Sequence, residues 1–155
     1  MNTDSVIIST LIDSIFLLAT FGVAISIVFI KGRQTLTNII IGCYIALVLF
    51  NYIPFQEIID TPIYSLIVFC VLVIAGTWLM RRLMPSEYSE GMFEDSLKKV
   101  ALAVVATTLI MALSYHALPV TELITPSQIT NQVFGSVDWF FYWLIGPLVI
   151  LYWAS

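Results

Sequence analysis

Two ionisable side chains lie in or beside long apolar segments, where a charge is costly. Asp13 falls inside the apolar run 6–30, and His116 follows Ser114 and Tyr115 near the end of a later run. A carboxylate inside hydrocarbon indicates a functional role, whereas one at the membrane interface caps or hydrates its helix. A histidine paired with such a carboxylate titrates near neutral pH. Asp13 and His116 are therefore the candidate functional residues, either as a proton-linked pair or as two interfacial hydrogen-bonding groups.

Other residue patterns that carry chemistry are absent from the sequence. It has no Gly-x-Ser-x-Gly, no His-Glu-x-x-His and no glycine-rich phosphate loop. Cys43 and Cys70 lie near the middle of apolar runs and have no metal-ligand spacing. We interpret them as two buried thiols, with an interhelical disulfide as the alternative if their Cβ atoms face each other closely. We predict no catalytic residue, cofactor or metal, and no enzymatic activity.

The composition is typical of a chain embedded in lipid. Its 155 residues are 60% hydrophobic and 10% charged, whereas a soluble domain has roughly 25% charged residues. We therefore predict a single transmembrane domain over residues 1–155, folded as an all-α, polytopic helical bundle of 4–5 helices. The formal net charge of -4 argues against nucleic acid as a partner.

Apolar runs predict the positions of the helices, and polar turns mark their ends. The turn after the first helix is short and basic, and Thr35 or Thr37 is expected to cap the second helix. The segment 119–138 is polar and rich in turn-forming residues. The expected helices cover residues 6–30, 36–53, 62–80, 97–118 and, as a short fifth, 139–153.

The last apolar run decides how often the chain crosses the membrane. As a helix, residues 139–153 reach roughly 22 Å, which is less than the roughly 30 Å of hydrocarbon. Aromatic residues at both ends, among them Trp139 and Trp153, resemble the two aromatic belts of a span. Pro147 is tolerated in a membrane helix when the freed carbonyl finds a partner. We favour a fifth crossing, with a re-entrant or surface-lying helix as the alternative.

The basic residues indicate the orientation of the helices. Two of the six follow the first helix, and the other four bracket the segment after the third helix, whereas residues 1–5, 51–60 and 119–138 contain none. Because cytoplasmic loops attract Lys and Arg, we expect an N-terminus outside. The topology-setting residues are Lys31, Arg33, Arg81, Arg82, Lys98 and Lys99.

Small residues within the helices are candidates for close helix contacts. Gly42-x-x-x-Ala46 is a small-xxx-small match on the second helix, and Ala75-Gly76 lies on the third. Gly22 is a further small residue, on the first helix. We expect these residues to pack helices within the chain, with self-association as the alternative.

Several features follow one another in a fixed order along the chain. They are the early membrane aspartate Asp13, the turn Lys31-Gly32-Arg33, the basic entry Lys98-Lys99 to the fourth helix and the aromatic-rich segment Trp139–Trp153. In this order the chain resembles the colicin V production (CvpA-like) membrane protein family, although its first turn has a single glycine. The resemblance implies a bacterial inner-membrane protein without known catalysis, connected to peptide-toxin export, envelope maintenance or stress tolerance.

We predict a non-enzymatic accessory or scaffold protein of the membrane, which supports secretion of peptide toxins or envelope maintenance. It would act through helix packing and through the inner loop 81–99, whose basic edges suit anionic lipid headgroups. The alternative is a small channel or transporter subunit with a proton-linked Asp13. The expected partners are the lipid bilayer and either further copies of the chain or another membrane protein.

Overall fold

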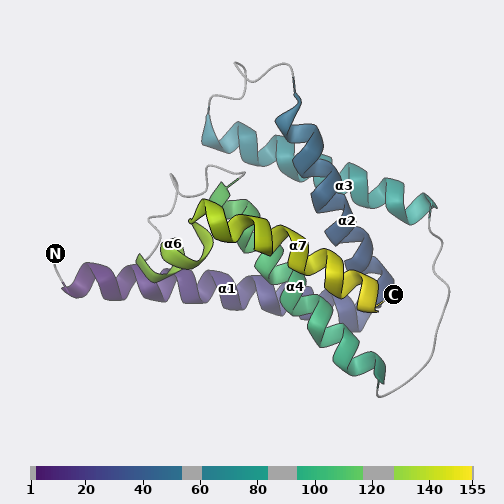
Figure 1. Cartoon of the computed structure of the whole chain (residues 1–155), viewed down its shortest axis with the longest axis horizontal. Coiled ribbons are helices and arrows are strands. Elements are labelled where there is room, and N and C mark those ends of the chain that lie inside the picture. The colour runs from purple at the N-terminus through teal and green to yellow at the C-terminus, as the bar shows by residue number, and fades with distance from the viewer. Residues whose placement is uncertain (1–2, 54–60, 84–93, 117–127, 155) are drawn as a thin grey trace.

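The chain folds predominantly into helices. This computed structural model describes residues 3–53, 61–83, 94–116 and 128–154. Within these ranges there is no strand, so the predicted all-α fold is confirmed. The helices are α1 (Thr3–Lys31), α2 (Arg33–Asn51), α3 (Pro62–Leu83), α4 (Glu94–His116), α6 (Gln128–Phe134) and α7 (Val137–Ala154) (Figure 1).

Four of these helices are long and apolar enough to cross a membrane. Most of the large side chains on the outer faces of α1 and α3 are apolar and exposed, as they are where lipid rather than water surrounds a helix. By length and composition the chain therefore has the character of a multipass membrane protein. The candidate spans are Thr10–Lys31, Arg33–Asn51, Pro62–Leu83 and Ser96–His116.

The turn between α1 and α2 is shorter than expected. Gly32 alone separates the two helices, and its φ of 85° is a left-handed conformation that glycine adopts without steric cost. Because the reversal is complete within one residue, α2 begins at Arg33, and the prediction that Thr35 or Thr37 caps it is wrong. The Thr35 hydroxyl instead donates a hydrogen bond of 3.0 Å to the Lys31 carbonyl.

α4 is the centre of the bundle. It packs against α1, α2 and α7 and contacts α6, so half of its apolar span is buried in protein. α3 lies at the edge and packs mainly on α2 (Figure 1). The core therefore follows α4, and the large side chains enclosed there include Val28, Leu36, Ile40, Leu102 and Leu109.

Two glycines bring α2 and α3 into backbone contact. A Cβ placed on Gly76 would lie 3.2 Å from the Cα of Gly42, and one placed on Gly42 would lie 2.9 Å from the Thr77 backbone nitrogen. Ala46, one turn further along α2, is fully buried. Gly22 is exposed, and a Cβ there would meet no atom within 4 Å. The expectation that Gly22 packs helices within the chain is therefore wrong, because α1 turns its opposite face to α4.

α7 runs along α4 in the opposite direction (Figure 1). At one end the rings of Phe140 and His116 have centroids 4.2 Å apart, and at the other the Lys98 Nζ lies 6.0 Å from the ring centroid of Trp153. As a continuous helix of 18 residues, α7 is about 27 Å long. The first turn of α7 thus lies beside the end of the candidate span in α4, and the last turn of α7 lies beside its beginning. Its apolar part, Trp139–Trp153, is shorter than the four candidate spans, so the fifth crossing stays a prediction.

A short helix, α6, forms within the segment that we expected to consist of turns. It covers Gln128–Phe134 and contacts both α4 and α7. Phe134 at its end is buried in a small core with Met111 and Ala112 of α4. The burial of this aromatic side chain accounts for the helix, since seven residues are too few to be stable by propensity alone.

Candidate functional site

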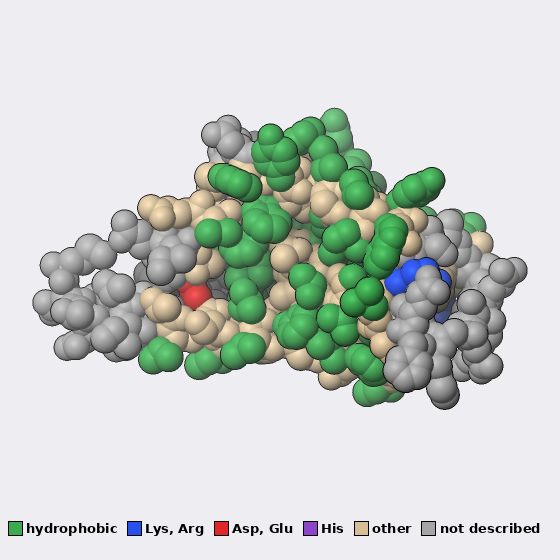
Figure 2. All heavy atoms as spheres, turned by 60° about the horizontal axis from the view of Figure 1, so that its bottom comes forward, with side chains coloured by type: hydrophobic (Ala, Val, Ile, Leu, Met, Phe, Trp, Pro, Cys, Tyr) green, Lys and Arg blue, Asp and Glu red, His purple; other side chains and the backbone are tan. Residues whose placement is uncertain are grey.

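The basic residues gather at one end of the bundle. Lysines and arginines lie in the last turns of α1 and α3 and the first turns of α2 and α4, and these helix ends gather at one end, here called the basic end. Asp13 lies toward the other end, here called the Asp13 end, because it interacts electrostatically with Tyr115 in the last turn of α4. Figure 2 shows an acidic side chain at the end away from the lysines and arginines. The basic residues thus occupy one end of the described bundle, where the first turn of α4 also contains Glu94 and Asp95.

Asp13 is buried within protein although it lies on a helix that is mostly exposed. Its side chain is 8% exposed, whereas Leu11, Ile12, Ser14 and Ile15 around it are all exposed. This difference follows from the packing of α1 on α4, because Asp13 lies on the face toward α4, within electrostatic range of Tyr115. The structure therefore covers Asp13 with protein, and because Asp13 lies in the first turn of the candidate span that begins at Thr10, its depth in the membrane stays a prediction.

His116 lies at the same end, as the last residue of α4. Its ring packs on Phe140 of α7, with centroids 4.2 Å apart and planes inclined by 39°. The Nε2 atom is buried and has no hydrogen-bond partner among the described residues. Tyr115, which interacts electrostatically with Asp13, directly precedes His116 in the chain. The two candidate residues are therefore brought to one end of the bundle, with Tyr115 between α1 and α6.

α6 covers this end through a cluster of aromatic rings. Phe134 is buried beside Tyr115 and Trp143, with ring centroids 6.0 Å and 5.1 Å away. The Trp143 indole N–H donates a hydrogen bond of 3.1 Å to the Val133 carbonyl, and the side chains of Tyr115 and Thr130 are hydrogen-bonded. We did not predict this cluster. Its signal in the sequence was the apolar pair Val133-Phe134 within a polar segment.

Three ionisable side chains share this end of the bundle. A carboxylic acid, a phenol and an imidazole from α1 and α4 lie at one end of the bundle, beneath aromatic rings of α6 and α7. Charges in such surroundings interact more strongly than in water. Among the described residues there is no group of three or more His, Cys, Asp or Glu side chains that could hold a metal ion.

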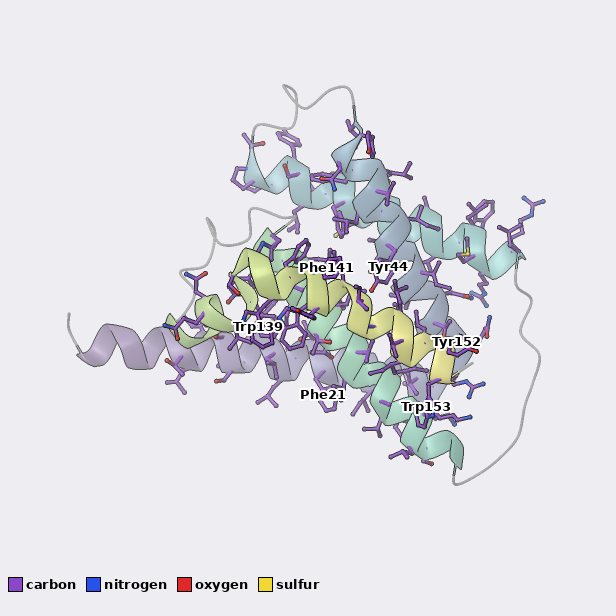
Figure 3. All side chains as sticks on the ribbon, viewed as in Figure 1. Phe21, Tyr44, Trp139, Phe141, Tyr152 and Trp153 are labelled. Carbon is purple, nitrogen blue, oxygen red and sulfur yellow. The ribbon has the colours of Figure 1, made fainter. Side chains whose placement is uncertain are left out.

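A second polar contact lies near the middle of α7. The Tyr44 hydroxyl on α2 donates a hydrogen bond of 2.5 Å to the Leu144 carbonyl (Figure 3). Leu144 lies three residues before Pro147, in the turn where proline disturbs the helical hydrogen bonds. The carbonyl that Pro147 leaves without an N–H partner is that of Trp143, four residues earlier. The partner expected for that carbonyl therefore stays a prediction, and Tyr44, bonded to the neighbouring carbonyl, ties α2 to α7.

Most of the other polar groups inside the bundle are bonded within their own helix. The Thr107 and Ser114 hydroxyls on α4 donate to the Ala103 and Ile110 carbonyls, at 2.8 Å in both cases. Asn38 differs, because it is 2% exposed and its Oδ1 has no hydrogen-bond partner within the part of the chain that the structure describes. Polar groups are therefore spread over the depth of the bundle rather than joined in one chain.

The two cysteines are free thiols on adjacent helices. Cys43 on α2 is buried, as expected, but Cys70 on α3 is exposed on the outer face. The interpretation of both as buried thiols is therefore wrong for Cys70, because α3 contacts the bundle mainly through α2 and leaves its other faces uncovered.

Comparisons with known proteins do not assign this chain to a family. No family model, curated protein or solved structure matches the chain. The resemblance to the colicin V production family stays a prediction from the residues quoted above.

Proposed function

We propose that this chain is a non-enzymatic accessory or scaffold protein of the cytoplasmic membrane, which supports the secretion of peptide toxins or the maintenance of the envelope. In this proposal α1, α2, α3, α4 and α7 cross the membrane, the N-terminus is outside and the basic end faces the cytoplasm. The resemblance of the sequence to the colicin V production family supports the role, and the gathering of all basic residues at one end supports the orientation.

The close packing of the helices is the observation that carries the scaffold role. α2 and α3 touch backbone to backbone, α4 is enclosed by three helices, and Tyr44 joins α2 to α7. The bundle is thus held by interhelical contacts, while the outer faces of α1 and α3 remain apolar and exposed. Such faces suit lateral contact with lipid and with the helices of other membrane proteins.

Site-specific photocrosslinking in native membranes tests the scaffold role. A photoreactive residue at Leu83 or Leu97, which flank the inner segment 84–93, should capture the same membrane protein at both positions. The matched control is Ile67, an exposed residue near the middle of α3, where lipid adducts should dominate. Residues 84–93 themselves lie outside the described residues. Lipid adducts alone at Leu83 and Leu97 would contradict the proposal.

The second candidate function is proton-linked transport, which one observation favours. Asp13 is 8% exposed inside a membrane helix, a position that is costly for a structural acid. If Asp13 carries protons, proteoliposomes containing the wild-type chain should show proton flux, and Asp13→Asn should abolish it. Ser14→Ala, at the exposed neighbouring position, is the matched control and should leave the flux unchanged. Equal flux in the wild type and Asp13→Asn would contradict this function.

A further inference from the structure

The basic end of the bundle divides into two groups of charges. Lys31, Arg33, Lys98 and Lys99 come from α1, α2 and α4, which all pack on one another. We call these four residues, together with Trp153 of α7, the inner corner. Arg81 and Arg82 belong to α3 and make a separate pair, because α3 is joined to the bundle mainly through α2.

An aromatic ring and partial burial hold charges of the inner corner at the level of a membrane interface. The Lys98 Nζ lies 6.0 Å from the ring centroid of Trp153, and Tyr152 beside it is exposed (Figure 3). Arg33 is half-buried, and Lys31 is exposed. Indole and phenol rings favour the headgroup region, and basic side chains reach the same level by extending their stems along apolar surface.

Apolar side chains continue from these charges toward the middle of the bundle. Phe29 and Ile30 on α1, and Val100 on α4, are exposed on the side of the basic residues toward the middle of the bundle. A ligand that contacts both the basic side chains and the apolar side chains must therefore carry an anionic group and a long apolar part. A phospholipid with a net negative charge has this structure, whereas a free phosphate ion has only the anionic group.

We propose that the inner corner binds an anionic phospholipid, with its phosphate at Lys31, Arg33 and Lys98 and an acyl chain along α1 and α4. A zwitterionic lipid is a poorer ligand because its own ammonium group is repelled by the lysines. Each Lys or Arg near an anionic headgroup strengthens binding about fivefold. Arg81 and Arg82 have the same charge and lie at the same end, and Arg82 also lies near an indole, with its Cζ 5.7 Å from the ring centroid of Trp78. They are the matched control, because α3 packs mainly on α2 and away from α1 and α4, which carry Lys31, Lys98 and Lys99.

Native mass spectrometry of the full chain, released from detergent, tests this site. The probes are dioleoyl phosphatidylglycerol, dioleoyl phosphatidylcholine and inorganic phosphate. We expect phosphatidylglycerol to bind and to resist displacement by millimolar phosphate, and phosphatidylcholine to bind at least tenfold more weakly. Lys31→Gln with Arg33→Gln should weaken phosphatidylglycerol binding roughly 25-fold, which is fivefold for each base. Arg81→Gln with Arg82→Gln should change it less than twofold.

Two further variants keep the test decisive if the double substitution disturbs folding. Lys98→Gln alone should weaken binding about fivefold, and Lys31→Arg with Arg33→Lys should retain it. Equal losses at the inner corner and at Arg81 and Arg82 would overturn the proposal, because they would indicate diffuse attraction to the whole basic end. Equal binding of the two lipids, or full displacement by inorganic phosphate, would overturn it as well.

Discussion

At the scale of single residues, polar groups in this chain differ mainly in what covers them. Asp13 and Ser14 are neighbours on α1, yet one is buried against the bundle and the other is exposed. His116 has a buried ring nitrogen without a partner among the described residues, whereas Thr107 and Ser114 are satisfied by their own helix. Tyr44 joins two helices and thereby has a structural role that its residue type alone does not indicate.

The Tyr44 hydroxyl gives the first prediction about stability. Tyr44→Phe removes the donor to the Leu144 carbonyl and leaves the ring in place, so it should lower the free energy of unfolding by about 1 kcal/mol. The measurement is reversible unfolding in mixed micelles. Tyr64→Phe, at an exposed position on α3, is the control and should have no effect. If Tyr44→Phe changed the free energy of unfolding no more than Tyr64→Phe does, the hydrogen bond would not stabilise the bundle.

At the scale of helices, the bundle consists of two helices in backbone contact and one central helix that the others surround. α2 and α3 meet at Gly42 and Gly76, and α4 is surrounded by α1, α2 and α7. The small residues on α2 and α3 lie at this contact, whereas Gly22 on α1 faces open space. One residue type therefore has two different environments, which depend on the neighbouring helix rather than on the local sequence.

These two environments lead to opposite predictions for the same substitution. Gly76→Val would place its side chain against the backbone of α2 and should lower the free energy of unfolding by about 2 kcal/mol. Gly22→Val should be neutral or slightly stabilising, since valine forms helix more readily than glycine. The same unfolding measurement checks both. A clear destabilisation by Gly22→Val would instead point to packing of α1 on a second copy of the chain.

At the scale of the whole molecule, the ends of the helices determine how the bundle lies in a membrane. Basic residues from α1, α2, α3 and α4 gather at one end, and the buried acid lies toward the other. α7 connects the two ends, with Trp139 and Trp153 toward its opposite termini (Figure 3). If α7 crosses the membrane as we propose, Trp139 and Trp153 should lie on opposite sides of it.

Labelling of single cysteines tests this arrangement. In a background of Cys43→Ser and Cys70→Ser, cysteine at Trp139 should react with a membrane-impermeant maleimide added outside the cell, and cysteine at Trp153 should react only after the membrane is opened. Both positions are exposed at the protein surface, so the side of the membrane decides the reaction. Labelling of both from the same side would indicate a re-entrant helix, and labelling of Trp153→Cys alone from outside would reverse the orientation.

The sequence by itself determined the all-α fold, the position of the long apolar helices and the separation of basic from base-free segments. Long apolar runs specify helices in lipid because backbone groups must be satisfied within the segment. Only the tertiary structure decided which faces are buried. Core-facing and lipid-facing positions are both apolar in these helices, so periodicity does not distinguish them. For this reason the burial of Asp13, the exposure of Gly22, the contact of Tyr44 with α7 and the course of α7 along α4 came from the packing of helices.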